Sequence, residues 1–297
     1  MERNKSGRTN IALDLLSQIG KNLLMGSTAV RRWRLSRPRT GTIYSNSEEF
    51  LRNYAFCSLE LLREHVGDIR AKSVCEIGPG DYLTSGLSIL AAGAIRYSVV
   101  DRFPGDYFGE AAKEWYREIE RNWERFYPDL PWDPTLNADD FPECAADRLE
   151  LIGEPLETAQ TSHKYDIVCS FQVGEHLSDI DAFAEMHNRV LEHGGIGLHR
   201  VDFGPHDVWF SYQDPGTFLR FSDRVWELTG SNRGVPNRKR HFEFLEAFDR
   251  AGLNTDVLYI DHFDRTAMDL NKLNKKFRDM PEESVLTGTA IYRLSRK

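Results

Sequence analysis

A glycine-rich turn between two apolar segments has the residue types of a nucleoside-binding loop. The first apolar segment, residues 74–77, carries Glu76 near its end, and Gly78 and Gly80 follow it. A helical pattern and a second apolar segment come next, and that segment ends in Asp101. Glycine is needed because the backbone turns tightly and passes close to a bound ligand. An acid about 20 residues past the glycines, at the tip of the next strand, is placed to accept hydrogen bonds from ribose hydroxyls.

Histidines and an acid accompany two later predicted strands. Residues 165–171 are continuous and β-branched, as buried parallel strands are, and His176 follows them. The next strand, residues 196–203, carries Asp202 and is followed by His206. An imidazole titrates in the useful pH range, and a carboxylate can orient it. We therefore predict His176 as the first candidate base, His206 as the second and Asp202 as an orienting or substrate-binding acid; each could instead make a structural hydrogen bond at a strand end.

Two other histidines are weaker candidates, and no metal is expected. His187 lies on the apolar face of a predicted helix, which favours a place in the core, and His199 lies inside a strand. Imidazole and carboxylate groups such as those of His176, Asp202 and His206 could ligate a divalent ion. The sequence has no dense acidic cluster, however, so a metal site is not predicted.

Strands and helices alternate along most of the chain. This order predicts an α/β fold: a doubly wound, mostly parallel seven-stranded sheet with helices on both faces. Residues 1–66 are expected to form an amino-terminal helical extension and residues 67–297 a Rossmann-like domain. Two insertions, at about 103–147 and 204–240, interrupt that domain and are too long for ordinary crossovers. Both are interpreted as lid segments, although the aromatic residues of the first could simply dock it on the core.

Apolar residues at helical spacing mark several segments outside the glycine turn. Residues 11–25 are predicted as a helix that packs on the main domain rather than on a membrane surface. Ser47 can cap a helix that ends near residue 66. Helices are also predicted over residues 110–127 and, with many charges, over residues 268–278.

Composition narrows the choice of partners and of compartment. The net charge of −8 argues against nucleic acid as the main partner, because phosphate binding needs a basic field. The four cysteines show no CxxC spacing, which fits a reducing cytoplasm. The sequence has no run of about 18 apolar residues, so no membrane span is expected. Polar interruptions in the first 30 residues argue against a signal peptide.

The choice of nucleoside ligand depends on the glycine turn. A dinucleotide fingerprint needs G-x-G-x-x-G, but the third position is Leu83. Glu76, two residues before the first glycine, would repel a pyrophosphate. A cationic sulfonium ligand with an amino group favours negative charge there. These observations favour S-adenosylmethionine over NAD.

Several motifs together resemble the class I S-adenosylmethionine-dependent methyltransferases that act on small molecules. The matching segments are EIGPG at 76–80, Asp101, YDIVCSFQVGEHLSD at 165–179 and VLEHGGIGLHRVDF at 190–203. The contacts that this resemblance implies are Glu76, Gly78 and Gly80 at the methionine end of the cofactor, Asp101 at its ribose, Glu154 near its adenine, and Gln172 through its backbone. The family often has a third glycine two residues after Gly80, where this chain has Tyr82, which could cover the cofactor.

The sequence therefore predicts an enzyme that transfers a methyl group from S-adenosylmethionine to oxygen or nitrogen of a small metabolite, natural product or sugar derivative. Two alternatives stay open: an NAD-dependent oxidoreductase, and a catalytically silent S-adenosylmethionine-binding partner subunit. The expected partner is a small-molecule substrate, with no nucleic acid and no membrane. A homodimer is an open alternative to a monomer.

Overall fold

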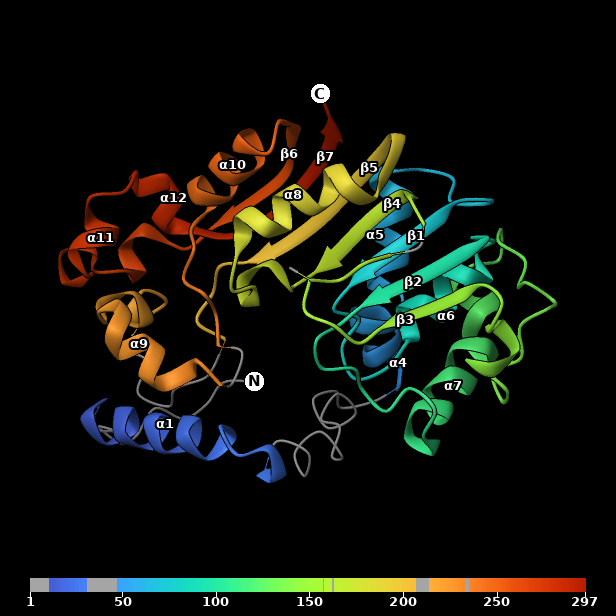
Figure 1. Cartoon of the computed structure of the whole chain (residues 1–297), viewed down its shortest axis with the longest axis horizontal. Coiled ribbons are helices and arrows are strands. Elements are labelled where there is room, and N and C mark those ends of the chain that lie inside the picture. The colour runs from blue at the N-terminus through green and yellow to red at the C-terminus, as the bar shows by residue number, and fades with distance from the viewer. Residues whose placement is uncertain (1–10, 31–46, 157, 162, 207–213, 233–234) are drawn as a thin grey trace.

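A seven-stranded sheet with the order β3-β2-β1-β4-β5-β7-β6 forms the centre of the molecule (Figure 1). The computed structural model describes residues 11–30, 47–156, 158–161, 163–206, 214–232 and 235–297. Its strands are β1 (Ser73–Ile77), β2 (Arg96–Val100), β3 (Leu149–Ile152), β4 (Tyr165–Phe171), β5 (Leu191–Asp202), β6 (Leu253–His262) and β7 (Thr287–Arg296). Neighbours from β3 to β5 pair in parallel, and β7 runs antiparallel to both β5 and β6. The predicted doubly wound, mostly parallel sheet is confirmed.

Alternate side chains of the central strands enter separate cores on the two faces of the sheet. Val74 and Ile167 belong to one core, and their neighbours Cys75 and Val168 belong to the other. The helices that cover the first face are α5 (Cys57–His65), α6 (Thr84–Ala91) and α7 (Glu110–Phe126), and those on the second are α8 (Ile180–Val190) and α10 (His241–Arg250). Because β1 and β4 are covered on both faces, their apolar runs are continuous rather than alternating.

The helices of residues 47–65 are part of the main core. They are α4 (Ser47–Phe50), the π-helix η1 (Leu51–Ala55) and α5. Phe50 is fully buried, and its ring stacks on that of Trp115 with 3.7 Å between the centroids. Leu59 and Leu62 are buried in the same core. This segment therefore forms a wall of the domain; the side chain of Ser47, predicted as a cap, lies outside the described part of the structure.

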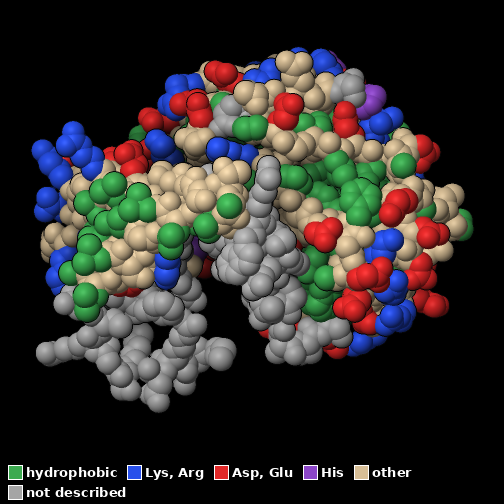
Figure 2. All heavy atoms as spheres, turned by 60° about the horizontal axis from the view of Figure 1, so that its bottom comes forward, with side chains coloured by type: hydrophobic (Ala, Val, Ile, Leu, Met, Phe, Trp, Pro, Cys, Tyr) green, Lys and Arg blue, Asp and Glu red, His purple; other side chains and the backbone are tan. Residues whose placement is uncertain are grey.

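The first helix, α1 (Ile11–Met25), packs on the main domain, as predicted, beside α9 (Asp223–Gly230). Its buried side chains are the polar Asp14, Gln18 and Asn22, and Leu15 packs, partly buried, against the apolar core that contains Trp226. Asn22 donates to the carbonyl of Leu228 at 3.0 Å and accepts from the amide of Asn232 at 2.8 Å. Leu16 and Leu23, which the helical pattern placed on the packing face, are 64% and 68% exposed. Figure 2 looks onto this side of the molecule and shows hydrophobic side chains on its surface. Helical spacing does not reveal these polar contacts of Asn22, which add to the apolar contact of Leu15.

The first insertion is docked on the core by its aromatic residues. Helix α7 buries Tyr116, Ile119 and Trp123, and the indole of Trp123 donates to the carbonyl of Leu130 at 2.7 Å. The short helix η2 (Glu143–Ala145) follows and leads into β3. The docking interpretation of these aromatic residues is therefore the one that the structure supports.

The second insertion packs against the segment between β6 and β7. Its described helices are η4 (Thr217–Arg220) and α9 (Asp223–Gly230). Phe218 and Trp226 share a small core with Met268 and Phe277. The single charged helix predicted over residues 268–278 is wrong: the segment forms η5 (Arg265–Ala267), η6 (Leu270–Lys272), α11 (Lys275–Arg278) and α12 (Glu282–Leu286). Side chains of Asp269 and Asn274 accept from nearby backbone amides and so start new turns there.

Within these described ranges, no helix has both the length and the apolar character needed to cross a membrane.

Candidate active site

A cavity of about 210 Å³ lies where β1 and β4 leave the sheet side by side. Ligands of open α/β sheets bind in the crevice at such a switch in strand order. Glu76, Gly78 and Gly80 line the cavity from the β1 side, and Gln172 lines it from the end of β4. The helices of residues 47–65 supply the opposite wall through Asn53, Tyr54, Cys57 and Ser58.

Both glycines of the turn have backbone conformations and surroundings that exclude a side chain. Gly78 has φ +67°, and a Cβ there would lie 2.8 Å from a methyl carbon of Val173. Gly80 has φ +86°, and a Cβ would lie within contact distance of the Tyr54 hydroxyl. That hydroxyl donates to the carbonyl of Pro79 at 3.1 Å. The backbone of the turn is therefore held close to whatever the cavity binds.

Glu76 is buried at the end of β1 with its carboxylate fixed by two donors. Ser85 donates to it at 2.6 Å, and the hydroxyl of Tyr97 donates to the same oxygen. Burial raises the pKa of Glu76, and the hydrogen bonds from Ser85 and Tyr97 oppose that shift. A cation bound in the cavity would favour the ionised form of this acid.

A second cavity, of about 520 Å³, lies next to the first at the carboxyl edge of the sheet. Gly78 lines both cavities, so the glycine turn separates them. Asp101, at the end of β2, lines the larger cavity with Leu156 and Val173. Burial raises the pKa of Asp101, while the backbone amide of Phe103, which donates to its carboxylate at 2.7 Å, opposes the shift. An acid and apolar walls suit the ribose and the flat base of a nucleoside.

Two residues assigned to the cofactor by sequence do not line either cavity as the described residues outline them. Tyr82 is 3% exposed and packs in the main core beside Leu83 and Tyr116. Tyr54, the fourth residue of the π-helix, lines the smaller cavity instead. Glu154 is exposed, and its neighbours Pro155 and Leu156 form the cavity wall instead.

The predicted polar residues after β4 and β5 lie together beside the larger cavity. Nε2 of His206 is 3.6 Å from Oε1 of Glu175 and 3.7 Å from Oδ2 of Asp202. The ring centroids of His176 and His206 are 5.0 Å apart, and His176 lines the cavity. His206 and Gln172 have positive φ values, 54° and 59°, that are uncommon outside glycine. The four side chains of Glu175, His176, Asp202 and His206 form what we call the EHDH cluster.

Glu175 is the buried member of the EHDH cluster. It is 2% exposed, and neither of its carboxylate oxygens has a hydrogen-bond partner among the described residues. Burial raises the pKa of Glu175 to about 8, with a further contribution from the nearby charge of Asp202. Perturbed acids of this kind concentrate at functional sites.

Asn237, from the second insertion, holds the turn that carries Glu175 and His176. Its side-chain amide donates to the carbonyls of Gly174 and Leu177 at 2.9 and 3.0 Å. Its backbone amide donates to the carbonyl of Glu175. Sequence reasoning missed Asn237 and Tyr54, because each acts through a contact between segments far apart in the chain.

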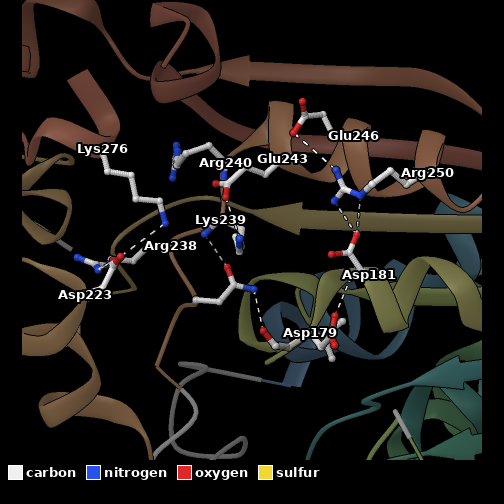
Figure 3. Close-up of polar contacts among 12 residues, drawn as sticks. Asp179, Asp181, Asp223, Arg238, Lys239, Arg240, Glu243, Glu246, Arg250 and Lys276 are labelled. Carbon is white, nitrogen blue, oxygen red and sulfur yellow. Dashed lines mark hydrogen bonds and ion pairs between the residues drawn. The ribbon is translucent and has the colours of Figure 1, made fainter. Parts of the chain in front are cut away.

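The basic residues at the end of the second insertion form internal contacts (Figure 3). Arg238 pairs with Asp223, and Lys239 lies 2.9 Å from Glu243. Arg240 is 1% exposed and donates to the backbone carbonyls of Phe203, Val285 and Thr287. These three side chains therefore stabilise the insertion rather than face a substrate.

His187 and His199 lie in the core, away from the two cavities. Their Nε2 atoms are 2.7 Å apart, and Nδ1 of His199 is 2.8 Å from the hydroxyl of Ser170. Burial lowers the pKa of His187 to about 4 and lowers the pKa of His199 well below its usual range. The expectation that His187 is a core histidine is confirmed.

Comparison with known proteins finds similar solved structures at low sequence identity. No protein-family model matches the chain, and no match was found among curated proteins. Similar solved structures include an S-adenosylmethionine-dependent methyltransferase from Mesorhizobium loti, at 12% identity and TM-score 0.46 over 83% of this chain and 100% of that one. The YcgJ protein from Bacillus subtilis has 14% identity and TM-score 0.44 over 81% and 99% of the two chains. A ribosomal protein L11 methylase from Lactobacillus delbrueckii subsp. bulgaricus has 10% identity and TM-score 0.41 over 86% and 81%.

These likenesses concern the arrangement of the chain and carry no information on its substrate. The class that the sheet defines is that of doubly wound α/β domains with a ligand crevice at the carboxyl edge. The resemblance of the sequence motifs to class I methyltransferases agrees with this fold.

Proposed function

We propose that the chain is an S-adenosylmethionine-dependent methyltransferase acting on a small molecule. The observation that carries this proposal is the pair of cavities that meet at Gly78. Glu76 lines the smaller one, where negative charge favours the amino group and sulfonium of the cofactor. Asp101 lines the larger one, where its carboxylate can accept from ribose hydroxyls.

The acceptor is proposed to bind beside the EHDH cluster. His176 lines the larger cavity, which is also bordered by Trp226 and Asn237 of the second insertion. Methyl transfer is an in-line displacement, so the protein mainly positions an acceptor and removes its proton. The acceptor oxygen or nitrogen forms the new bond to the methyl carbon, and the carbon–sulfur bond breaks with its electron pair on sulfur. The acceptor proton passes to a base, for which His176 is the first candidate and His206 the second.

The proposed substrate is small because the described part of the site is a recess rather than an open surface. The larger cavity, at about 520 Å³, has to hold the ribose and base of the cofactor as well as the acceptor, which favours a small acceptor. The net charge of −8 further disfavours nucleic acid.

Isothermal titration calorimetry with S-adenosylmethionine and with NAD tests the choice of cofactor. The proposal predicts binding of S-adenosylmethionine with one site per chain and no measurable heat from NAD. Binding of NAD without binding of S-adenosylmethionine would identify the oxidoreductase alternative and end the proposal.

A further inference from the structure

Three side chains of the EHDH cluster have the donor atoms and spacing of a metal site. Ligand atoms of Glu175, His176 and His206 all lie within 4.8 Å of one another. Donors at about 2.1 Å from one ion are separated by up to about 4.2 Å, so small side-chain adjustments bring the three together. Asp202 reaches the same histidine, with its Oδ2 3.7 Å from Nε2 of His206.

The buried carboxylate of Glu175 gives an independent reason to place an ion there. A buried carboxylate without a donor is costly, and acids so placed are normally paired or bound to a metal. Both oxygens of Glu175 lack a hydrogen-bond partner in the described ranges, and Nε2 of His206 is buried without one as well. Two unsatisfied groups that face each other across 3.6 Å can both be satisfied by one cation.

We propose that Glu175, His176 and His206 bind one divalent transition-metal ion, with Asp202 beside it as a fourth ligand or as a base. Two imidazoles and a carboxylate favour Zn²⁺, Mn²⁺ or Fe²⁺ over Mg²⁺ or Ca²⁺, which prefer oxygen donors alone. The sequence analysis predicted no metal site. It considered His176, Asp202 and His206 as ligands, but not Glu175, whose burial is seen only in the structure.

The position of the ion indicates which atom of the substrate accepts the methyl group. This part of the inference rests on the proposed function. His176 belongs to the wall of the larger cavity, so an ion that it binds is open to a molecule in that cavity. A metal ion lowers the pKa of a bound hydroxyl, which makes oxygen the acceptor atom rather than nitrogen. The hydroxyl proton then passes to Asp202, the oxygen takes the methyl group, and the sulfonium becomes a thioether. His176 acts as a ligand and not as the base when the ion is bound.

Metal content and metal affinity of the untagged full chain test the site without any substrate. After treatment with a chelator, the chain is titrated with Zn²⁺ and Mn²⁺, and bound metal is measured by mass spectrometry after dialysis. We expect one ion per chain and at least a 10-fold loss of affinity in Glu175→Gln and in His206→Ala. His193→Ala, which removes an exposed histidine, is the matched control and is expected to bind as the wild type does.

A second measurement separates loss of the site from loss of the fold or of the cofactor. S-adenosylmethionine binding and circular dichroism are recorded for the same variants, and both are expected to be unchanged. No stoichiometric uptake by the wild type, or equal affinity in all variants, would overturn the metal site. Metal uptake without S-adenosylmethionine binding would instead leave the site standing and contradict the proposed function.

Discussion

The two acids of the proposed cofactor site, Glu76 and Asp101, differ in the hydrogen bonds that their carboxylates accept from the protein. Glu76 is fixed by Ser85 and Tyr97, which donate to its carboxylate in the wall of the smaller cavity. Among the described residues, Asp101 accepts from the amide of Phe103 alone, and its remaining lone pairs are available to a ligand. Asp101 is therefore the side chain whose replacement should affect cofactor affinity with the least effect on the fold.

Asp101→Asn is expected to weaken S-adenosylmethionine binding about 10-fold. The amide keeps an acceptor for Phe103 but loses the charge that strengthens hydrogen bonds to the ribose, a loss of about 1.4 kcal/mol. Calorimetry on the variant measures the change. Glu154→Gln makes the same chemical change at an exposed acid that does not line the cavity, and its affinity should equal that of the wild type. Equal affinity in both variants would remove Asp101 from the site.

Gly80→Ala is expected to abolish most cofactor binding through the backbone of the turn. An added Cβ meets the Tyr54 hydroxyl, and φ +86° costs a non-glycine residue about 1–2 kcal/mol. Tyr54→Phe removes the hydroxyl, so the double variant should recover part of the lost affinity. Wild-type affinity in Gly80→Ala, measured by the same titration, would show that the turn does not contact the ligand.

Among the elements, α8 and β5 are joined in the core by two neutral histidines. His187 comes from α8 and His199 from β5, and Ser170 of β4 completes the chain of hydrogen bonds. The arrangement depends on both imidazoles staying uncharged. Burial lowers the pKa values of the two histidines, and no acid contributes to either shift by stabilising a charged imidazole.

The wild-type protein is therefore expected to lose stability as the pH falls from about 6.5 towards 4. Over that range the unfolded chain binds a proton at His187 that the folded chain does not, which favours unfolding by up to about 3 kcal/mol. Denaturant unfolding across this range should show a smaller pH dependence in His187→Gln, which keeps a hydrogen-bonding group. The exposed-site variant His193→Gln should behave as the wild type, and an identical slope in all three proteins would contradict a neutral buried pair.

The elements that sequence reasoning predicted best are those determined by local pattern. The strands β1 and β4 are short and rich in β-branched and apolar residues, and their buried parallel pairing follows from that pattern. Helix α1 shows the limit, because Leu16 and Leu23 are exposed and Asn22 makes hydrogen bonds to Leu228 and Asn232 that helical spacing does not reveal. The segment 263–286 forms several short helices rather than one, because side chains such as Asp269 and Asn274 cap new turns. The charged sequence of this segment is compatible with a single helix, so these caps could not be predicted from it.

At the scale of the whole molecule, the topology of the sheet brings together residues that are far apart in the sequence. Gly78, Asp101, His176 and His206 are predictable as strand-end residues, since parallel strands end at one edge. Tyr54 and Asn237 were not predictable, because each reaches the site from a segment outside the βαβ units. The buried state of Glu175 depends on packing by the turn and by Asn237, so its unsatisfied carboxylate could be seen only in three dimensions.

The net negative charge of the molecule is compatible with a cationic cofactor and a small-molecule substrate. Acidic residues exceed basic ones, 46 to 38, which favours steering of a cationic cofactor over binding of polyanions.

The most direct test is transfer of a labelled methyl group. The metal-loaded chain is incubated with S-adenosylmethionine carrying a deuterated methyl group and with fractions of small-molecule extract, and the products are analysed by mass spectrometry. We predict a small molecule that gains one labelled methyl group on oxygen, together with S-adenosylhomocysteine, and a strong loss of both products in Asp101→Asn and Glu175→Gln. Binding of S-adenosylmethionine with no labelled product from any fraction would contradict a methyltransferase and indicate a silent cofactor-binding subunit.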